Sequence, residues 1–327
     1  MILTAYLEFI IFNSLMMVIG FGLEWLWGWP ASLYRHIGHP VSWIGRLISW
    51  LDAVLNRPEY SASLRYLAGI ACLLIIAGIS AAMGAGLLAL LPLTALGICL
   101  GGLFSFPMLA GKSLALHVQA VATPLHEDDM AAASDAVSMI VGRDVSALDE
   151  AGISRAAIES LAENTSDGII APLFWGVLAG LPGLYLYKAV NTLDSMIGYK
   201  TDRHGAFGRA SARFDDLVNL VPARLCGLLF CLTSPTPVNS LRQMRAEAGQ
   251  HRSPNAGWPE SALASSLDIQ LSGPRTYQHH ITTDAIINPS GRIARKEDIP
   301  LALARFRQVM IFTCILLIAI ASGAALI

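Results

Sequence analysis

Six apolar runs, separated by polar segments, form the main pattern along the chain. The longer runs match the length of a helix that crosses a hydrocarbon core about 30 Å thick. Backbone polar groups in such a core must be hydrogen-bonded within the segment, which favours helices. We therefore expect an all-α, polytopic integral membrane protein of one domain, with four to six membrane segments and helical polar loops. The apolar runs are 2–26, 64–91, 93–109, 168–187, 217–233 and 309–327, and the polar segments are 30–63, 112–164, 188–216 and 234–308.

The run 168–187 differs from the others because glycine and proline interrupt it. A straight helix tolerates proline poorly in its interior. The run is therefore either one kinked span or a re-entrant pair of half-helices. Broken backbone at membrane depth is allowed where it lines a polar cavity, and this run lies between two polar clusters. The interrupting residues are Pro172, Gly176, Gly180, Pro182 and Gly183.

The distribution of arginine suggests an orientation. Arginines outnumber acidic residues between 35 and 65, which favours the cytoplasmic side for that segment. Strict alternation of all six runs would put the basic loop 200–213 on the opposite side. The positive-inside rule prefers both loops on one side, and a re-entrant 168–187 would allow this.

Composition supports the membrane protein class and argues against one kind of partner. The chain has 327 residues, of which 54% are hydrophobic and 14% charged, against roughly 25% charged in soluble domains. The mean hydropathy is +0.54. The net charge of −2 argues against a nucleic-acid partner, which would require a basic surface. The five cysteines all lie in apolar runs without a CxxC pair, so we interpret them as small buried hydrophobic residues.

Polar side chains are concentrated between Arg155 and Asp216, at the edges of apolar runs. Placing an ionisable group there costs several kcal/mol of free energy unless the group is paired or has a role in function. We therefore expect the active site in this stretch. One alternative remains for its first part, because Arg155, Glu159 and Glu163 share one face of a helix that Ser154 would cap, and they could form a solvated salt-bridge ladder.

The residue types suggest phosphate chemistry with a divalent cation. Lys188, Asn191 and Asp194 recur at helical spacing. Carboxylate and amide oxygens suit Mg²⁺, and cationic side chains suit phosphate oxygens. Helix-end anchors and ion pairs are the alternative interpretation. The metal candidates are Asn191, Asp194, Asp215 and Asp216, and the phosphate candidates are Lys188, Lys200, Arg203 and Arg213.

Several longer motifs resemble one known family. They are Glu163–Gly168 (ENTSDG), Tyr187–Tyr199 (YKAVNTLDSMIGY), Ala212–Leu217 (ARFDDL) and Ser253–Glu260 (SPNAGWPE), together with the early His39-Pro40-Val41. In these motifs the chain resembles the cobalamin biosynthesis protein CobD/CbiB family, over nearly its whole length.

The resemblance implies an adenosylcobinamide-phosphate synthase, an ATP-dependent ligase in cobalamin (vitamin B12) biosynthesis. Such an enzyme joins a propionate carboxylate of the corrinoid adenosylcobyric acid to the amine of (R)-1-aminopropan-2-ol phosphate or ethanolamine phosphate. We expect ATP and Mg²⁺ to be needed. The resemblance also implies a multi-pass protein of the bacterial inner membrane, with the active site facing the cytoplasm and the membrane cobalamin synthase as a partner. Candidate bases are Glu163 and Asp167, with His39 as a weaker candidate, and Asn164, Asn255 and Glu260 are candidates for substrate binding.

Two other functions fit parts of the sequence. An intramembrane Mg²⁺-dependent prenyl or CDP-alcohol transferase also uses aspartates at helical spacing, but it requires repeated Asp-x₃-Asp patterns. The chain instead has Asn191-x₂-Asp194 and the adjacent pair Asp215-Asp216. A non-catalytic membrane sensor like AmpE would share the membrane frame, but it has no evident need for the motifs at 163–168 and 254–260.

Overall fold

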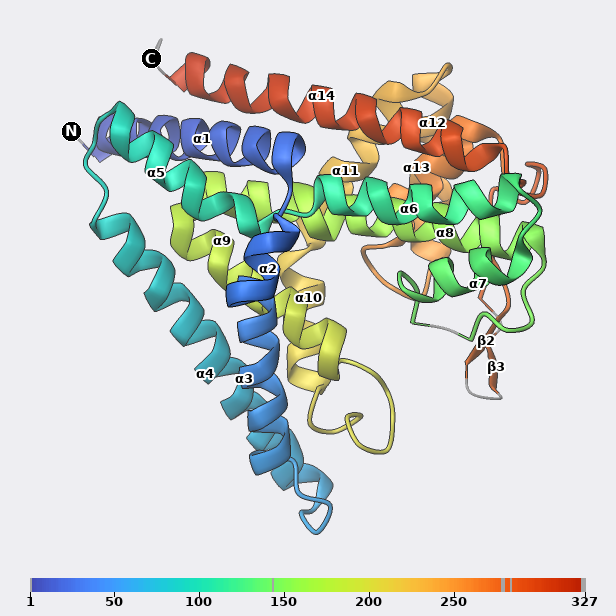
Figure 1. The fold of residues 1–327 in the computed structure, drawn as a ribbon, viewed down its shortest axis with the longest axis horizontal. Coiled ribbons are helices and arrows are strands. Elements are labelled where there is room, and N and C mark those ends of the chain that lie inside the picture. Colours follow the sequence, from blue (N-terminus) through green and yellow to red (C-terminus); the bar gives the residue numbers. More distant parts are fainter. Residues whose placement is uncertain (1, 143, 278–279, 283, 325–327) are drawn as a thin grey trace. The chain divides into compact units, whose positions relative to one another are not determined.

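The computed structural model describes residues 2–142, 144–277, 280–282 and 284–324 (Figure 1). These residues are mainly α-helical, with a few strands of two or three residues. Their contacts divide the chain into two compact units. Unit 1 comprises Met1–Ala110, Ala171–Asn219 and Cys314–Ile327, and unit 2 comprises Gly111–Ile170 and Leu220–Thr313.

Unit 1 is a set of helices around the packed pair α4 and α9. Proline or a capping side chain fixes two of the helix starts. Pro40 opens α3, and the Ser61 hydroxyl caps α4 by accepting a hydrogen bond from Leu64 N at 3.3 Å. The elements are α1 (Ile2–Trp27), α2 (Ala31–Ile37), α3 (Pro40–Leu55), α4 (Ala62–Ala89), α5 (Ala95–Ser105), the 3₁₀ helix η1 (Phe106–Met108), α9 (Ala171–Ile197) and α10 (Arg209–Val218).

The core of unit 1 joins α3, α4, α9 and α10. Ile48, Cys72 and Leu193 are fully buried in it, together with Phe207 from the loop before α10. Glycine allows α4 to approach its neighbours closely. A Cβ atom at Gly84 would lie 2.5 Å from the Leu181 carbonyl oxygen, so the two helix backbones are in contact there.

The interruption predicted in 168–187 is a kink at Gly180. This residue has φ 64° and ψ −155°, which divides α9 into two helical parts. Glycine adopts this conformation without steric cost. The buried Asn13 side chain donates a hydrogen bond to the Val177 carbonyl at 3.2 Å, directly before the kink. The amide therefore satisfies backbone that a straight helix would satisfy by itself.

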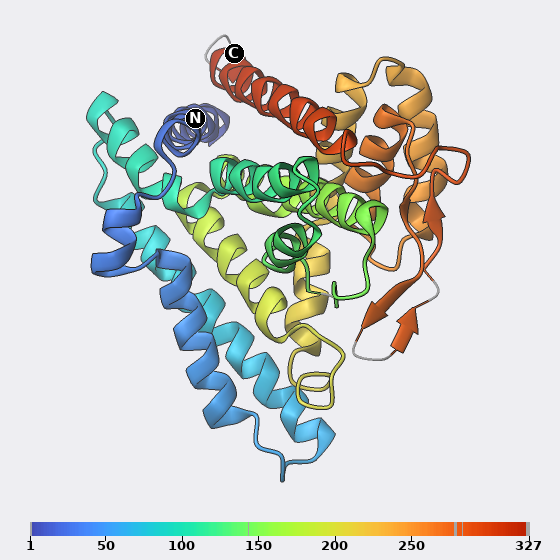
Figure 2. The same ribbon diagram turned by 45° about the vertical axis from the view of Figure 1, so that its right-hand side comes forward.

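Unit 2 contains shorter helices and two small antiparallel sheets of two strands each, β1 with β4 and β2 with β3. Figure 2 shows its strands as orange arrows. The long last helix, α14 (Asp298–Ala324), begins in unit 2. The other elements are α6 (Gly111–His126), α7 (Met130–Ser138), α8 (Glu150–Thr165), the π-helix η2 (Ser166–Ile170), α11 (Leu220–Thr233), α12 (Pro237–Glu247), the 3₁₀ helix η3 (Ala248–Gln250), α13 (Gly257–Leu267), β1 (Leu271–Ser272), β2 (Arg275–Tyr277), β3 (His280–Thr282) and β4 (Ile286–Ile287).

The start of α8 differs from the sequence expectation. We expected Ser154 to cap a helix beginning near Arg155. The helix instead begins at Glu150, because the Asp149 carboxylate accepts a hydrogen bond from Gly152 N at 2.8 Å. An aspartate is a strong N-cap and places favourable negative charge at the helix N-terminus. Ser154 is fully buried inside the helix.

Five helical segments of the described chain are long and apolar enough to cross a membrane. The pair α10 and α11, taken as one broken span, would make a sixth. The chain is therefore an all-α polytopic membrane protein, as predicted. Three segments are longer than the apolar runs they overlap, namely those that correspond to 93–109, 168–187 and 309–327. The predicted span 309–327 ends in residues 325–327, outside the described part. The segments are Thr4–Trp27, Ala62–Ala89, Ala95–His126, Glu150–Ile197 and Asp298–Gly323.

Candidate functional site

The second part of α9 carries the polar face expected from the sequence. Lys188, Asn191 and Asp194 are half-buried there, in regular helix beyond the Gly180 kink. The helix ends just after Asp194, where Gly198 N donates to the Asp194 carbonyl at 2.8 Å. A Cβ at position 198 would lie 2.0 Å from Asp194 Oδ1. Glycine therefore leaves room for this carboxylate at the end of the helix.

The buried aspartate of α10 joins this face. Asn191 and Asp194 both approach the Asp215 carboxyl group. Asn219, which follows α10, donates to Asp215 Oδ2 at 3.0 Å and accepts from the Tyr187 hydroxyl at 2.9 Å. Asp215 Oδ1 is buried and has no hydrogen bond of regular geometry within the described residues. Two carboxylates and an amide therefore meet between α9 and α10.

This group has the donor chemistry of a divalent-cation site with few protein ligands. Neighbouring carboxylates repel each other in a poorly solvated place unless a proton or a cation intervenes. No set of three or more histidine, cysteine, aspartate or glutamate residues is arranged around one metal position in the described chain. Mg²⁺ commonly takes only one or two carboxylates and completes its shell with water and substrate phosphate. The predicted residues Asn191, Asp194 and Asp215 fit that pattern.

His39 lies before α3 and is held as a neutral imidazole. Its Nδ1 atom accepts a hydrogen bond from Val41 N at 3.2 Å and so caps the helix. Its ring packs edge-on against Trp29, with centroids 4.9 Å apart. Burial and, secondly, the charge of Lys188 lower the pKa of His39 to about 4. Because Nδ1 is the acceptor, Nε2 carries the proton. A donor role therefore fits this geometry better than the base role expected from the sequence.

The other candidate cations of unit 1 differ in their surroundings. Lys200 and Arg213 are exposed, and the Lys200 charge acts on the Asp216 carboxyl group. Arg203 is held instead by Asp52 of α3, with its Nη2 atom 2.5 Å from Asp52 Oδ2. Its guanidinium is therefore engaged within the protein, whereas Lys200 faces solvent.

In unit 2, the motif at 163–168 spans the change from α-helix to π-helix. Glu163 and Asn164 are exposed at the end of α8, and Asp167 is half-buried in η2. Asn164 donates to the Ser160 carbonyl at 2.9 Å. A π-turn inserts an extra residue and is frequent at functional sites. It therefore changes the direction of the side chains that follow, and Asp167 lies close enough to Cys226 of α11 to act on it electrostatically.

The ladder alternative for this helix is partly correct. The Glu159 carboxylate is buried and accepts a hydrogen bond from Ser272 N at 2.6 Å, and Arg155 Nε lies 3.9 Å from it. Glu159 therefore ties α8 to β1 and has a structural role. Glu163, one turn later, is exposed.

The motif at 253–260 forms a buried polar group at the start of α13. Glu260 is 1% exposed, and its Oε1 atom lies 3.7 Å from His251 Nε2. His251 Nδ1 accepts from Ser253 N at 3.0 Å, which directs the Nε2 side of the ring toward Glu260. Asn255 is also buried, at 6% exposure. The motif therefore positions Asn255 and Glu260 firmly inside unit 2.

The structure thus brings some predicted residues together and engages others elsewhere. Asn191, Asp194 and Asp215 meet, while Asp216 lies with Lys200. Sequence reasoning missed several residues that complete these groups. Asn219 could have been found from its spacing of four after Asp215, but nothing in the sequence connects Asp52 with Arg203. The missed residues are Asp52, Asn56, Arg65, Tyr187, Asn219 and His251.

Comparison with known proteins identifies the family. The sequence matches the family described as CobD/Cbib protein over residues 17–306. Cobalamin biosynthesis protein CobD of Rhodobacter capsulatus is 50% identical over 295 residues, which cover 90% of this chain and 93% of the relative. CobD of Sinorhizobium sp is 46% identical, with 85% and 89% covered, and CobD of Rhizobium meliloti is 43% identical, with 89% and 92% covered. No solved structure matches the chain. The chain therefore belongs to the CobD/CbiB family of cobalamin biosynthesis proteins.

Proposed function

We propose that this chain is an adenosylcobinamide-phosphate synthase. It joins a propionate carboxylate of adenosylcobyric acid to the amine of (R)-1-aminopropan-2-ol phosphate or ethanolamine phosphate. The observation that carries the proposal is the meeting of Asn191, Asp194 and Asp215, with Lys188 on the same α9 face. Hard oxygen donors beside a cation suit a reaction in which a phosphoryl group is transferred. The names of the relatives support the pathway.

The reaction requires an activated carboxylate, because a carboxylate anion is a poor electrophile. ATP transfers its terminal phosphoryl group to the carboxylate oxygen, giving an acyl phosphate and ADP. The amine then attacks the carbonyl carbon, the C–O bond to phosphate breaks, and inorganic phosphate leaves. The attacking nitrogen loses a proton to a base, for which Glu163 and Asp167 are the candidates.

The chemistry of each polar residue suits it to one role in this reaction. Asn191, Asp194 and Asp215 would hold Mg²⁺, with Asp216 beside them, and the bound ion would neutralise charge on the transferring phosphoryl group. Lys188, Lys200 and Arg213 bind phosphate oxygens as point charges or forks. The neutral His39 side chain donates a hydrogen bond from its Nε2 atom to a substrate. Asn164 is exposed and contacts the organic parts of the substrates. Asn255 and Glu260, which the sequence suggested for the same role, are buried and would support the site from within unit 2.

The surroundings of the enzyme follow from its substrates. We place the protein in the bacterial inner membrane with its active site facing the cytoplasm, where ATP is available. The membrane cobalamin synthase, which uses the corrinoid later, is its proposed partner. Gentle solubilisation of membranes that contain both proteins should co-purify them, and separate elution would argue against the complex.

The first prediction concerns the intact protein and its aspartates. Detergent-purified protein should convert adenosylcobyric acid to the amide only when the amino alcohol phosphate, ATP and Mg²⁺ are all present, as read by mass spectrometry. Asp194→Ala should abolish turnover, and Asp215→Asn should lower it roughly 10²- to 10³-fold, because each removes charge stabilisation at the phosphoryl group. Glu59→Gln, in the exposed turn between α3 and α4, is the matched control.

Each outcome has a clear meaning. All variants should elute at the same size as the wild type, which shows that they fold. Normal turnover by Asp194→Ala would remove that residue from the site. No product from wild-type protein, with lipid and both amino alcohol phosphates tried, would contradict the synthase proposal and favour the sensor alternative.

A further inference from the structure

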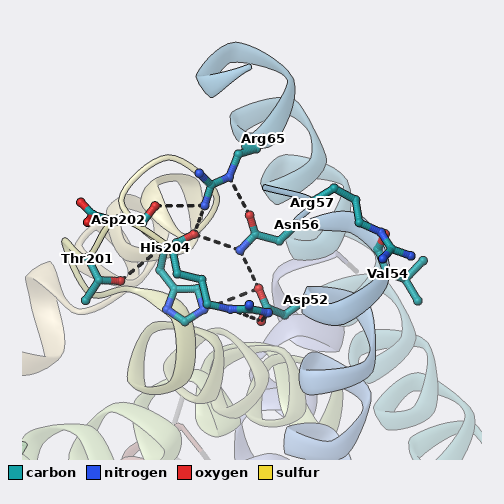
Figure 3. A network of polar contacts seen from close by, with 9 residues as sticks. Asp52, Val54, Asn56, Arg57, Arg65, Thr201, Asp202 and His204 are labelled. Atoms are coloured by element: carbon teal, nitrogen blue, oxygen red, sulfur yellow. Dashed lines mark hydrogen bonds and ion pairs between the residues drawn. The ribbon is translucent and has the colours of Figure 1, made fainter. Parts of the chain in front are cut away.

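A dense polar network in unit 1 attaches the loop between α9 and α10 to the α3–α4 hairpin (Figure 3). We call Asp52, Asn56 and Arg65 the loop clamp. Asp52 lies on α3, Asn56 directly follows α3, and Arg65 lies in the first turn of α4. The loop, residues 198–208, is more than 130 positions away in sequence.

The carboxylate of Asp52 is the centre of the clamp. Its Oδ2 atom accepts from Arg203 Nε at 3.1 Å and from Nη2 at 2.5 Å. Its Oδ1 atom accepts from Asn56 Nδ2 at 2.7 Å and lies 3.5 Å from His204 Nε2. Asp52 is only 8% exposed. A buried carboxylate with this many partners fixes their positions, because loss of any one leaves charge poorly compensated.

Asn56 and Arg65 hold the loop backbone itself. Asn56 Nδ2 donates to the Arg203 carbonyl at 3.0 Å, and its Oδ1 accepts from Arg65 Nε at 2.8 Å. Arg65 Nη2 donates to the Asp202 carbonyl at 3.1 Å and also to the Arg203 carbonyl. Carbonyls of the loop are thus bound irrespective of its side chains.

The loop has a second anchor beyond the clamp. Phe207 is fully buried in the core, and a Cβ at Gly69 of α4 would lie 1.8 Å from its carbonyl oxygen. Lys200 lies in the loop between the end of α9 and the two residues that the clamp holds. It is exposed, and its positive charge interacts with the Asp216 carboxyl group of α10. By holding the neighbouring loop backbone, the clamp therefore fixes the position of Lys200, although none of the described contacts joins a clamp residue to Lys200 itself.

We propose that Asp52, Asn56 and Arg65 are positioning residues, which hold loop 198–208 so that Lys200 stays beside Asp216 of α10 to receive a phosphate group. The inference rests on the proposed function, because it assigns the clamp to the phosphate subsite of the same reaction. The clamp residues act through Lys200 and do not contact substrate. Either phosphate-bearing substrate, ATP or the amino alcohol phosphate, would be bound by that ammonium.

The test compares Arg65→Gln and Asp52→Asn with Arg57→Gln in the intact, detergent-purified protein. Arg57 lies in the same hairpin but donates only to the Val54 carbonyl, at 3.1 Å, among the described contacts. Amide hydrogen exchange of residues 199–204 should accelerate roughly tenfold or more in both clamp variants, because charge-assisted hydrogen bonds are lost. Arg57→Gln should exchange like the wild type. Arg65→Lys should be intermediate, because one ammonium cannot bridge Asn56 and the loop carbonyls.

Two further readouts separate positioning from general stability. The acylation rate of Lys200, read by mass spectrometry against Lys296 as internal reference, should change in the clamp variants. The KM for at least one phosphate-bearing substrate should rise about tenfold, while kcat changes less.

Two outcomes would contradict the proposal. Unchanged exchange and Lys200 reactivity would overturn the clamp, and changed exchange with unchanged KM would overturn its positioning role. Wild-type protein without synthase activity would contradict the proposed function alone, because exchange and acylation still report whether the clamp holds Lys200.

Discussion

At the scale of single residues, hydrogen bonding decides what each polar group can do. His39 and Arg203 illustrate this. Both were plausible site residues from the sequence, yet the imidazole caps α3 through Nδ1 and the guanidinium pairs with Asp52. A cap or an ion pair between distant segments depends on atoms that the local sequence does not bring together. The residue type therefore predicted which chemistry each side chain could perform, and its hydrogen-bond partners decided which role it has in the structure.

The buried His39 predicts an acid-sensitive stability. Its pKa in the folded protein is lowered to about 4 by burial and by Lys188, against about 6.5 for an unperturbed histidine. The unfolded chain therefore binds this proton first, and stability should fall as the pH drops from about 6.5 toward 4. The melting temperature in detergent should fall between pH 7.5 and pH 5, and by less in His39→Asn, which retains a capping side chain.

The control for this experiment is His36→Asn, in the exposed helix α2. It should show the same drop as the wild type. Equal drops in wild type and His39→Asn would show that this imidazole is not the group responsible.

At the scale of elements, glycine placement decides which helices pack. The apolar runs predicted α4 and α9 individually, but not their contact. Gly84 lies against Leu181 and Pro182, next to the kink at Gly180. A Cβ atom at Gly86 of the same helix would meet no other part of the described chain within 4 Å. Sequence shows two similar glycines, and only the packed structure distinguishes them.

These two glycines provide a matched test of the packing. Gly84→Ala should lower the free energy of unfolding by about 1–3 kcal/mol, because its Cβ would overlap backbone atoms of α9. Gly86→Ala should be neutral or stabilising by about 0.5–1 kcal/mol, as for alanine in any open helical position. Thermal unfolding of both variants in the same detergent measures the difference. Equal stability would mean that α4 and α9 can separate without cost at this point.

At the scale of the whole molecule, the clamp bears on the orientation question that the sequence left open. Arg65, at the start of α4, contacts the carbonyls of Asp202 and Arg203, so the α3–α4 turn and loop 198–208 lie together. We infer that both lie on one side of the bilayer. Strict alternation of the apolar runs would have separated them. The positive-inside rule, applied to both basic segments, favours the same arrangement.

Chemical labelling can test this arrangement. Single cysteines introduced as Glu59→Cys and Asp202→Cys, in a chain without its native cysteines, should react with a membrane-impermeant maleimide from the same side. We expect that side to be cytoplasmic, so inverted vesicles should label and intact cells should not. The unsubstituted cysteine-free chain is the control. Labelling of the two positions from opposite sides would contradict the contact.

The sequence alone determined the class of this protein, because apolar length and low charge depend on composition and not on contacts. It also determined the break near Gly180 and the Lys188–Asp194 face, since helical spacing is local. Only the tertiary structure decided that Asp215 joins Asn191, that Asn219 and Tyr187 complete the group, and that Asp52 holds Arg203. Those contacts join residues far apart in the chain, and their positions follow from packing between helices, which no local pattern encodes.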